Sequence, residues 1–169
     1  AESNEIRRLL TGILVSGTPE NPVVFASSSD WRIGGQDLGT DTDVDTNSGV
    51  FSRLSWNGLE WDKIDLVRGL PRSEENHASN GIALDASSNI IYLAQGGHTN
   101  MGAPSQNFVF LPEYALSGAI LSIDLNLLDT LPAQIDPVRP DTDGDGIDDN
   151  FFVYDIPTLD DDTRNFSNG

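Results

Sequence analysis

An internal repeat constrains the fold of this chain more than any other feature of its sequence. Three short segments recur in the same order at nearly one period. The matching segments are 11–15 with 80–84, 23–26 with 90–93, and 48–51 with 117–120, at offsets of 69, 67 and 69 residues. Because three ordered matches at one period rarely arise by chance, the sequence predicts two copies of one structural unit.

Each copy consists of short segments with strand character, separated by turn-forming residues. Residues 22–26 and 89–94 are β-branched and aromatic runs bounded by turn formers. Residues 49–56 and 59–66 flank Asn57-Gly58, and an Asn-Gly pair in this position predicts a tight hairpin, since both central residues take positive φ. Residues 121–131 have some helical character, but polar residues at 122, 124 and 126 alternate with apolar residues at 121, 123 and 125, and this period of two favours a strand.

These elements predict an all-β fold of β-propeller type, with four-stranded antiparallel blades. A β-sandwich with accidental internal similarity is the alternative. The expected units are 1–66 (first blade), 67–135 (second blade) and 136–169 (an acidic calcium-loop insertion and the start of the next unit), about two and a half blades in all. Because a closed propeller needs about four to eight blades, this ring is incomplete. Remaining blades or neighbouring chains are therefore the expected partners.

The charge of the chain excludes several classes of partner. Its 169 residues include 27 Asp or Glu against 9 Lys or Arg, a formal net charge of −18. We expect no nucleic-acid and no membrane partner, because both attract proteins through positive charge. A strongly acidic surface favours divalent cations or a salty exterior instead. The absence of Cys excludes disulfides and thiolate metal sites.

The strongest local motif is the acidic loop 141–149, Asp-Thr-Asp-Gly-Asp-Gly-Ile-Asp-Asp. Carboxylates at loop positions 1, 3, 5 and 9, with glycine at position 6, match the calcium loop of EF-hand type. We therefore predict Ca²⁺ bound by Asp141, Asp143, Asp145, the carbonyl of Ile147, and Asp149. Position 12 is Phe152, where an EF-hand has a bidentate Glu, so Asp155 or water must supply the remaining ligand. A solvated acidic linker is the alternative.

A second acidic loop, 39–47, carries Asp41, Asp43 and Asp45 at every second position. Three carboxylates spaced in this way are able to share a cation, but no glycine fixes the turn. A polar loop between strands is the alternative.

The third candidate is a charged cluster at 68–81, which contains two Arg, two Glu, Asn and His ahead of a predicted inner strand. Loops in this position line the axial face of a propeller, where ligands bind. His77 is a candidate general base because the unperturbed pKa of histidine lies near neutrality. A charged loop ordered by Arg–Glu pairs is the alternative. His98, after Gly96-Gly97, is expected to be a turn residue.

Residues 76–84 and 91–97 resemble the His-containing blade of the soluble quinoprotein glucose/sorbosone dehydrogenases. The resemblance is closer still to large secreted bacterial proteins that carry such a propeller. It covers Leu-Pro-Arg-Ser-Glu-Glu-Asn-His, Asn-Met-Gly-Ala-Pro-Ser and Leu-Pro-Glu-Tyr-Ala-Leu-Ser at 70–77, 100–105 and 111–117. It spans roughly residues 6–131, and the loop 141–149 is an insertion.

This resemblance implies a secreted protein, extracellular or periplasmic, whose intact six-bladed propeller binds Ca²⁺ and pyrroloquinoline quinone (PQQ) and oxidises a sugar hydroxyl. His77 matches the residue that removes the hydroxyl proton in that family. The family's Arg and Lys contacts to the quinone, and its catalytic calcium ligands, lie in later blades that this chain lacks. We therefore expect the segment alone to be inactive. The alternative is a non-catalytic extracellular scaffold, adhesion or filament module stabilised by Ca²⁺, with carbohydrate as a further expected partner.

Overall fold

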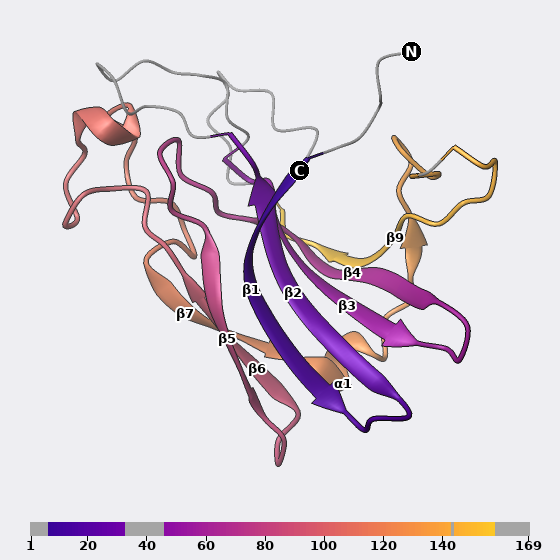
Figure 1. Ribbon diagram of the computed structural model, residues 1–169. Coiled ribbons are helices and arrows are strands. Elements are labelled where there is room, and N and C mark those ends of the chain that lie inside the picture. The colour runs from indigo at the N-terminus through magenta and orange to yellow at the C-terminus, as the bar shows by residue number, and fades with distance from the viewer. Residues whose placement is uncertain (1–6, 33–45, 143, 158–169) are drawn as a thin grey trace.

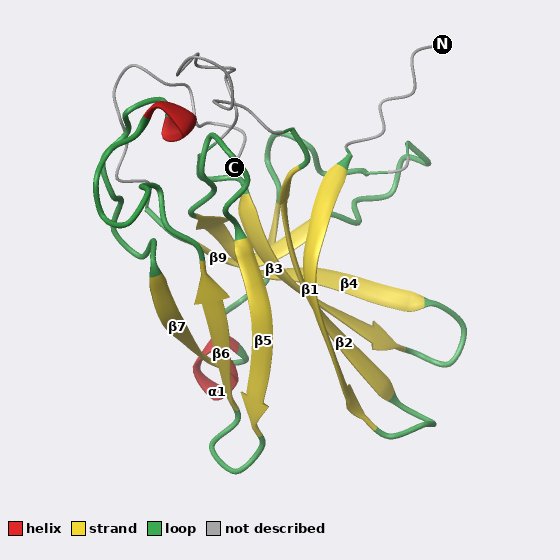
Figure 2. Ribbon diagram, turned by 60° about the vertical axis from the view of Figure 1, so that its left-hand side comes forward, coloured by secondary structure: helices red, strands yellow, loops and turns green. Residues whose placement is uncertain are grey.

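The computed structural model describes residues 7–32, 46–142 and 144–157, and its architecture is two β-sheets that face each other (Figures 1 and 2). Strands hold 47% of the described residues and helices 5%, which confirms the predicted all-β class. The strand orders are β1-β2-β3-β4-β9-β8 and β5-β6-β7, and neither sheet is closed. β1 lies beside β5, and long loops gather at one end of both sheets (Figure 1).

The first sheet begins as an antiparallel meander, and two short strands from late in the chain extend it. Its strands are β1 (Arg8–Gly17), β2 (Pro22–Asp30), β3 (Gly49–Trp56), β4 (Trp61–Leu70), β8 (Gln134–Ile135) and β9 (Phe151–Asp155). β9 pairs in parallel with β4, and β8 pairs antiparallel with β9. The second sheet comprises β5 (Ser79–Asp85), β6 (Ile90–Gln95) and β7 (Ala119–Asp124), and the described helices are η1 (Gln106–Phe108) and α1 (Leu125–Leu128).

The predicted repeat is visible in the strand register of the two sheets. Phe25 of β2 lies opposite Leu14 of β1. Tyr92, which corresponds to Phe25 at the offset of 67, lies opposite Ala83, which corresponds to Leu14 at the offset of 69. The pairings of β2 with β3 and of β6 with β7 correspond in the same way. β1–β3 and β5–β7 are therefore equivalent meanders, as the sequence segments predict.

The two sheets pack together through faces that do not correspond to each other in the repeat, and the core lies between them. We call the side of the first sheet that carries Gly12, Leu14, Phe25 and Phe51 the Gly12 face, and the side of the second sheet that carries Ile82, Leu84, Ile91 and Leu93 the Ile82 face. These faces contribute to one hydrophobic core. The Phe25 and Phe51 rings stack within it, with centroids 5.7 Å apart. Burial of this apolar surface is the main stabilising contribution to the fold.

The backbones of β1 and β5 touch at Gly12. A Cβ atom added to Gly12 would lie 1.9 Å from the carbonyl oxygen of Asn80, so only glycine permits this approach. Next to it, the Thr11 hydroxyl donates a hydrogen bond to the Ser79 carbonyl, and the Ser27 hydroxyl lies 3.3 Å from the same oxygen. Because these hydroxyls satisfy a carbonyl that the second sheet buries, the sheets come together without leaving that polar atom unpaired.

The β3–β4 hairpin is confirmed, but its turn is longer than the Asn-Gly pair predicts. Trp56 lies opposite Trp61, which leaves four residues in the turn. The Asn57 side chain accepts hydrogen bonds from the N–H groups of Leu59 and Glu60, at 2.9 and 3.0 Å. This side-chain turn replaces the two-residue turn, because an Asn side chain competes for nearby backbone donors.

The predicted strand at 121–131 is wrong beyond Asp124, where the chain turns into α1. The Asp124 carboxylate accepts a hydrogen bond from the Leu127 N–H at 3.1 Å and so caps the first turn of the helix. Leu125 and Leu128, three residues apart, are both buried. The cap and the helical spacing of these two leucines stabilise α1, although the alternation of apolar and polar residues favours a strand.

The remaining chain departs from a simple succession of blades. Within the described residues, the second sheet has three strands, and β8 and β9 join the first sheet. The boundary predicted between residues 66 and 67 falls within β4. The predicted unit boundaries themselves stay predictions. None of the described helices is long and apolar enough to cross a membrane.

A buried ionic network joins β4 to both ends of the acidic loop. Asp65 accepts hydrogen bonds from the Ser52 hydroxyl (2.7 Å), the Lys63 ammonium (2.6 Å) and the Arg68 guanidinium (3.1 Å). Arg68 also donates to Asp136 (2.6 Å) and Asn150 (2.9 Å). Burial raises the pKa of Asp65, but the charges of Lys63 and Arg68 and the hydrogen bonds lower it more, so the net pKa is below its ordinary value.

We predict that Asp65→Asn destabilises the chain by about 3 kcal/mol at pH 7, because it leaves part of a buried ionic network uncompensated. Since the pKa of Asp65 is lowered by folding, its stabilisation is present above the ordinary pKa of 3.8 and is lost as the pH falls through the folded-state pKa. Urea unfolding at pH 7 and near pH 3 measures both effects. Equal unfolding free energies for wild type and variant at pH 7 would contradict the network's role.

Candidate functional site

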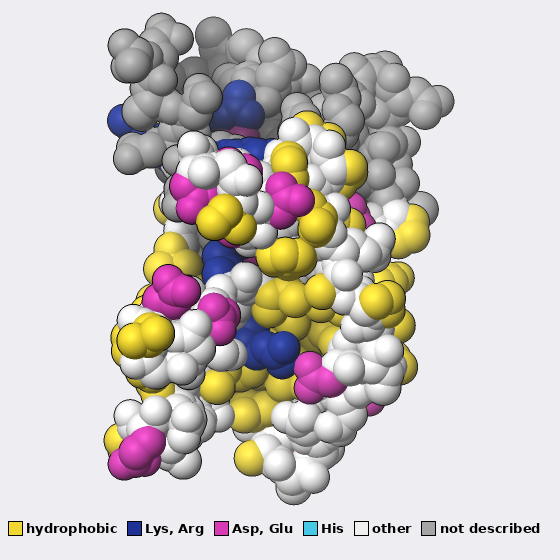
Figure 3. Space-filling model, turned by 90° about the vertical axis from the view of Figure 1, so that its right-hand side faces the viewer, with side chains coloured by type: hydrophobic (Ala, Val, Ile, Leu, Met, Phe, Trp, Pro, Cys, Tyr) yellow, Lys and Arg dark blue, Asp and Glu magenta, His cyan; other side chains and the backbone are white. Residues whose placement is uncertain are grey.

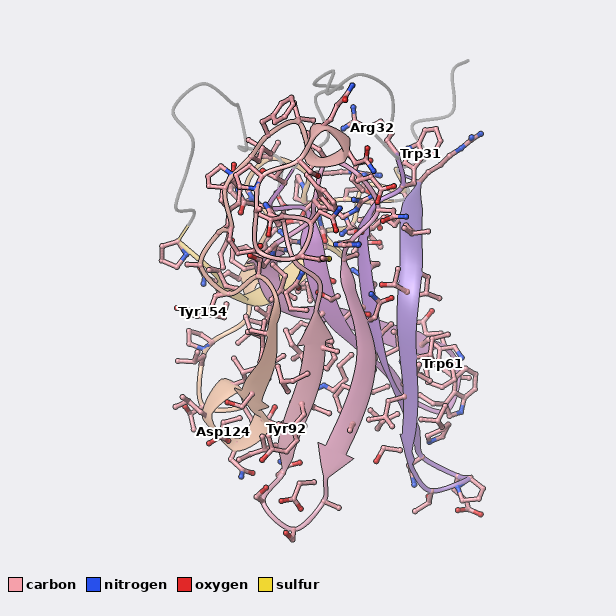
Figure 4. All side chains as sticks on the ribbon, turned by 90° about the vertical axis from the view of Figure 1, so that its left-hand side faces the viewer. Trp31, Arg32, Trp61, Tyr92, Asp124 and Tyr154 are labelled. Carbon is pink, nitrogen blue, oxygen red and sulfur yellow. The ribbon has the colours of Figure 1, made fainter. Side chains whose placement is uncertain are left out.

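The loop that carries His77 is anchored by the buried guanidinium of Arg72. This group donates hydrogen bonds to the carbonyls of Arg32 (2.7 Å), Glu75 (3.1 Å) and Ser73. It thus ties the loop 71–78 to the end of β2, close to the labelled Trp31 and Arg32 (Figure 4). Burial lowers the pKa of Arg72, while the carboxylates of Asp30 and Glu74 oppose this shift. Arg72 therefore holds the loop in shape through backbone contacts rather than through the Arg–Glu pairs alone.

His77 is half-buried at the loop end of the second sheet, and contacts on both sides fix its ring. Nδ1 lies 3.0 Å from the carbonyl oxygen of Gly97, and the ring packs against Phe108 with centroids 4.9 Å apart. Its backbone N–H donates to the Ser73 hydroxyl at 2.8 Å. Because a carbonyl oxygen only accepts hydrogen bonds, Nδ1 carries the proton. In the neutral ring Nε2 is then the nitrogen with the lone pair.

Glu113 orders the neighbouring loop and was not predicted from the sequence. Its carboxylate accepts hydrogen bonds from the His98 N–H (2.6 Å) and from the hydroxyls of Thr99 (2.5 Å) and Ser117. Burial raises the pKa of Glu113, but these hydrogen bonds and the His98 ring lower it more, so the net pKa is lowered. His98, predicted to be a turn residue, is buried against Tyr114 with ring centroids 4.3 Å apart.

The acidic loop 141–149 folds around the carboxylate of Asp141. This group accepts hydrogen bonds from the N–H groups of Gly144 (2.6 Å) and Gly146 (2.8 Å), both of which have positive φ. Asp145 accepts from the Ile147 N–H at 2.7 Å. Asp149 accepts from the Thr142 hydroxyl (2.6 Å) and N–H (2.7 Å), and these bonds lower the pKa of Asp149. Three of the predicted ligand side chains, those of Asp141, Asp145 and Asp149, thus each accept hydrogen bonds from groups of the loop itself.

Several predicted ligand positions are not brought together or lie beyond what is described. Asp143 and the second acidic loop with Asp41, Asp43 and Asp45 lie outside the described residues. Asp155 lies on β9 beside Gly69, and burial raises its pKa, with Asp136 adding to the shift and Arg68 opposing it. Among the described residues, no group of three or more His, Cys, Asp or Glu side chains is placed to hold a metal ion.

An apolar cavity of about 600 Å³ lies between the sheets, on elements other than those of His77. Its lining includes Val67 and Leu70 of β4, Leu128 of α1 and Tyr154 of β9. The Arg53 guanidinium of β3 and the Asp129 carboxylate after α1 form an ion pair across the sheets at 2.9 Å. On the side of the molecule that Figure 3 faces, hydrophobic side chains line a hollow that also contains basic side chains.

No protein-family model, curated protein or solved structure matches this chain.

The described residues near His77 do not fit the quinone that the family resemblance implies. PQQ carries carboxylates, so a binding site needs accessible cations. Arg72 is buried and donates to backbone carbonyls, and the Arg32 guanidinium is paired with Asp30 at 3.0 Å. These two guanidinium groups are therefore already engaged by other groups of the chain.

We predict that the neutral His77 ring is protonated at Nδ1, because Gly97 offers only an acceptor there. Long-range ¹⁵N–¹H correlation spectra at pH 8 distinguish the two tautomers. An Nε2-protonated ring would contradict the described contact.

Proposed function

We propose that this chain is a β-propeller-type segment that serves as a calcium-stabilised extracellular scaffold and is not by itself an enzyme. The observation that carries the proposal is the packing of two equivalent meanders through unlike faces, the Gly12 face on the Ile82 face. Successive blades of a propeller pack in this way, because each unit is rotated with respect to the one before it. In a sandwich, the outward-facing residues of each sheet are polar, whereas β1, β2, β5 and β6 carry apolar residues on both sides.

The geometry around His77 supports a structural role for this loop. The Arg72 guanidinium donates its hydrogen bonds to backbone carbonyls. The His77 ring is fixed by its contact with the Gly97 carbonyl and by packing against Phe108. A loop with these anchors forms a rigid surface at one end of the sheets. Such a surface suits the binding of a partner such as carbohydrate, through the polar groups that remain exposed.

Calcium is part of this proposal. Each carboxylate oxygen of Asp141 and Asp149 that accepts one N–H or O–H keeps a further lone pair for a cation. The Arg68 network holds both ends of the loop segment to β4 through Asp136 and Asn150. A hard cation that neutralises these carboxylates would stabilise the segment most where Ca²⁺ is plentiful, which is outside cells. A net charge of −18 fits the same location.

We predict that Ca²⁺ binds the whole chain with a Kd of roughly 0.1–1 mM, and that Asp145→Ala weakens binding roughly 10-fold or more through loss of a ligand charge. Asp148→Ala is the matched control, since it removes the same charge from a loop position that is not a predicted ligand. Isothermal titration calorimetry with CaCl₂ measures both. Equal binding by the two variants, or no binding by wild type, would contradict the calcium claim.

A second candidate function is oxidation of a sugar hydroxyl in the intact protein, with His77 as general base. The tautomer of His77 favours it, since a lone pair on Nε2 is what a base requires. In this case the quinone site and its cations belong to blades beyond this segment.

We predict no turnover from the chain alone when it is supplied with PQQ, CaCl₂, aldose sugars and an electron-accepting dye. The reason is that the described cations near His77 are already paired. Dye reduction should equal that of a His77→Gln variant. Sugar-dependent reduction that disappears in His77→Gln would contradict the scaffold proposal and favour the second candidate.

A further inference from the structure

Each sheet leaves apolar side chains of one face open, on the first sheet at β1 and β2, because Ser52 and Asp65 on the same face belong to the buried ionic network. On the second sheet this is the side that carries Gly81, Ala83, Tyr92 and Ile120, which we call the Gly81 face; Figure 4 looks onto it, with Tyr92 labelled. On the first sheet it is the side that carries Ile13, Val15, Val24 and Ala26, which we call the Ile13 face. A sheet that faces water normally alternates apolar and polar residues, whereas these strands are apolar on both sides.

The Gly81 face is the repeat equivalent of the Gly12 face, which the second sheet covers. Phe51 is fully buried (0% exposed), but its equivalent Ile120 is 68% exposed. Phe25 is 4% exposed, but its equivalent Tyr92 is 43% exposed. Because the two faces hold equivalent positions in equivalent ladders, the difference in exposure arises because no sheet of the described residues covers the Gly81 face, and not from the strands themselves.

The two glycines differ in the same way. Gly12 is required because the Asn80 carbonyl oxygen would lie 1.9 Å from its Cβ atom. At Gly81, the nearest atom to an added Cβ is the Ala94 methyl at 3.9 Å, which is ordinary contact. A glycine within a strand costs stability and often marks the close approach of another backbone. At Gly81 the place for that backbone is present, but no described strand fills it.

The Ile13 face is the equivalent of the Ile82 face, which supplies the other half of the contact inside the chain. Ile13 and Val15 are 59% and 67% exposed, although their equivalents Ile82 and Leu84 pack against the core. The segment around Asp136 and Asn150 binds Arg68 of β4 and leaves this face open at β1. The chain therefore exposes the equivalent of one half of its internal contact, and the β1 and β2 part of the equivalent of the other half.

We propose that the Gly81 face of one copy of this chain binds the Ile13 face of a second copy and repeats the contact between the two sheets of one chain. This inference rests on the propeller-type arrangement proposed above. A second copy is the occupant because, in the described part of the chain, the Gly12 face packs on the Ile82 face, and the equivalent of the Ile82 face, the Ile13 face, is open at β1. The contact is heterologous, so it generates either a closed ring or an open stack. With two sheets per chain, a ring of propeller size holds about two to four copies.

The test is sedimentation velocity over a concentration series up to about 100 µM, where an interface of micromolar Kd is populated. Ile120→Asp blocks the Gly81 face, and Val15→Asp blocks the Ile13 face. Leu59→Asp is the matched control, because Leu59 is exposed at the tip of the β3–β4 hairpin, in the turn between the strands. Each blocking variant should weaken self-association about 30-fold or more, and the control should leave it unchanged. Far-UV circular dichroism confirms that each variant is folded.

Mixing the two blocking variants decides whether the contact is heterologous. Each retains the face that the other lacks, so an equimolar mixture should form a one-to-one dimer and nothing larger. A monomeric wild type, unchanged association in either blocking variant, or a mixture that stays monomeric would overturn the proposal. Calcium binding by a monomeric chain would leave the proposed scaffold function standing while this inference fails, so the two are distinguishable.

Discussion

The structure depends on the close contact between β1 and β5, where Gly12 lets the Asn80 carbonyl of the second sheet approach the backbone of the first. This contact sets which faces meet, because it brings the Gly12 face of one sheet onto the Ile82 face of the other. Phe25 and Phe51 then fill the space between the sheets and become the centre of the core. Since β1–β3 and β5–β7 are equivalent meanders, the same contact leaves apolar side chains on the other face of each meander that no described strand covers.

The candidate sites are held by polar anchors on this scaffold. Arg72 ties the His77 loop to the end of β2, and Glu113 orders the chain around Gly97, which in turn holds the His77 ring. Arg68 joins β4 to both ends of the acidic loop. In each case one buried or partly buried charged side chain satisfies several groups of a long loop, which is how an irregular segment keeps a defined shape without its own core. The His77 loop and the acidic loop are built from different segments of the chain.

Sequence patterns predicted the features that arise from local chemistry. The repeated segments correspond to equivalent ladders, and the Asn57-Gly58 hairpin forms, because β-branched runs and turn residues act over a few residues. The Asp124 cap, by contrast, replaces the expected strand with α1, and one carboxylate outweighs a weak alternation. The parallel pairing of β9 with β4 and the hydrogen bonds of Glu113 join residues that are far apart in the chain. A periodic pattern of neighbouring residues cannot predict such contacts. The calcium ligands and the catalytic role of His77 stay predictions.

The most direct test of this account compares alanine at the two equivalent glycines, at protein concentrations low enough to keep the chain monomeric. Gly12→Ala places a methyl group against the Asn80 carbonyl and should cost about 3 kcal/mol of unfolding free energy in urea. Gly81→Ala meets open space and should be neutral, or stabilising by up to about 1 kcal/mol, since alanine restricts the unfolded chain. Equal effects at the two positions would contradict the claim that non-equivalent faces of two equivalent meanders meet at β1 and β5.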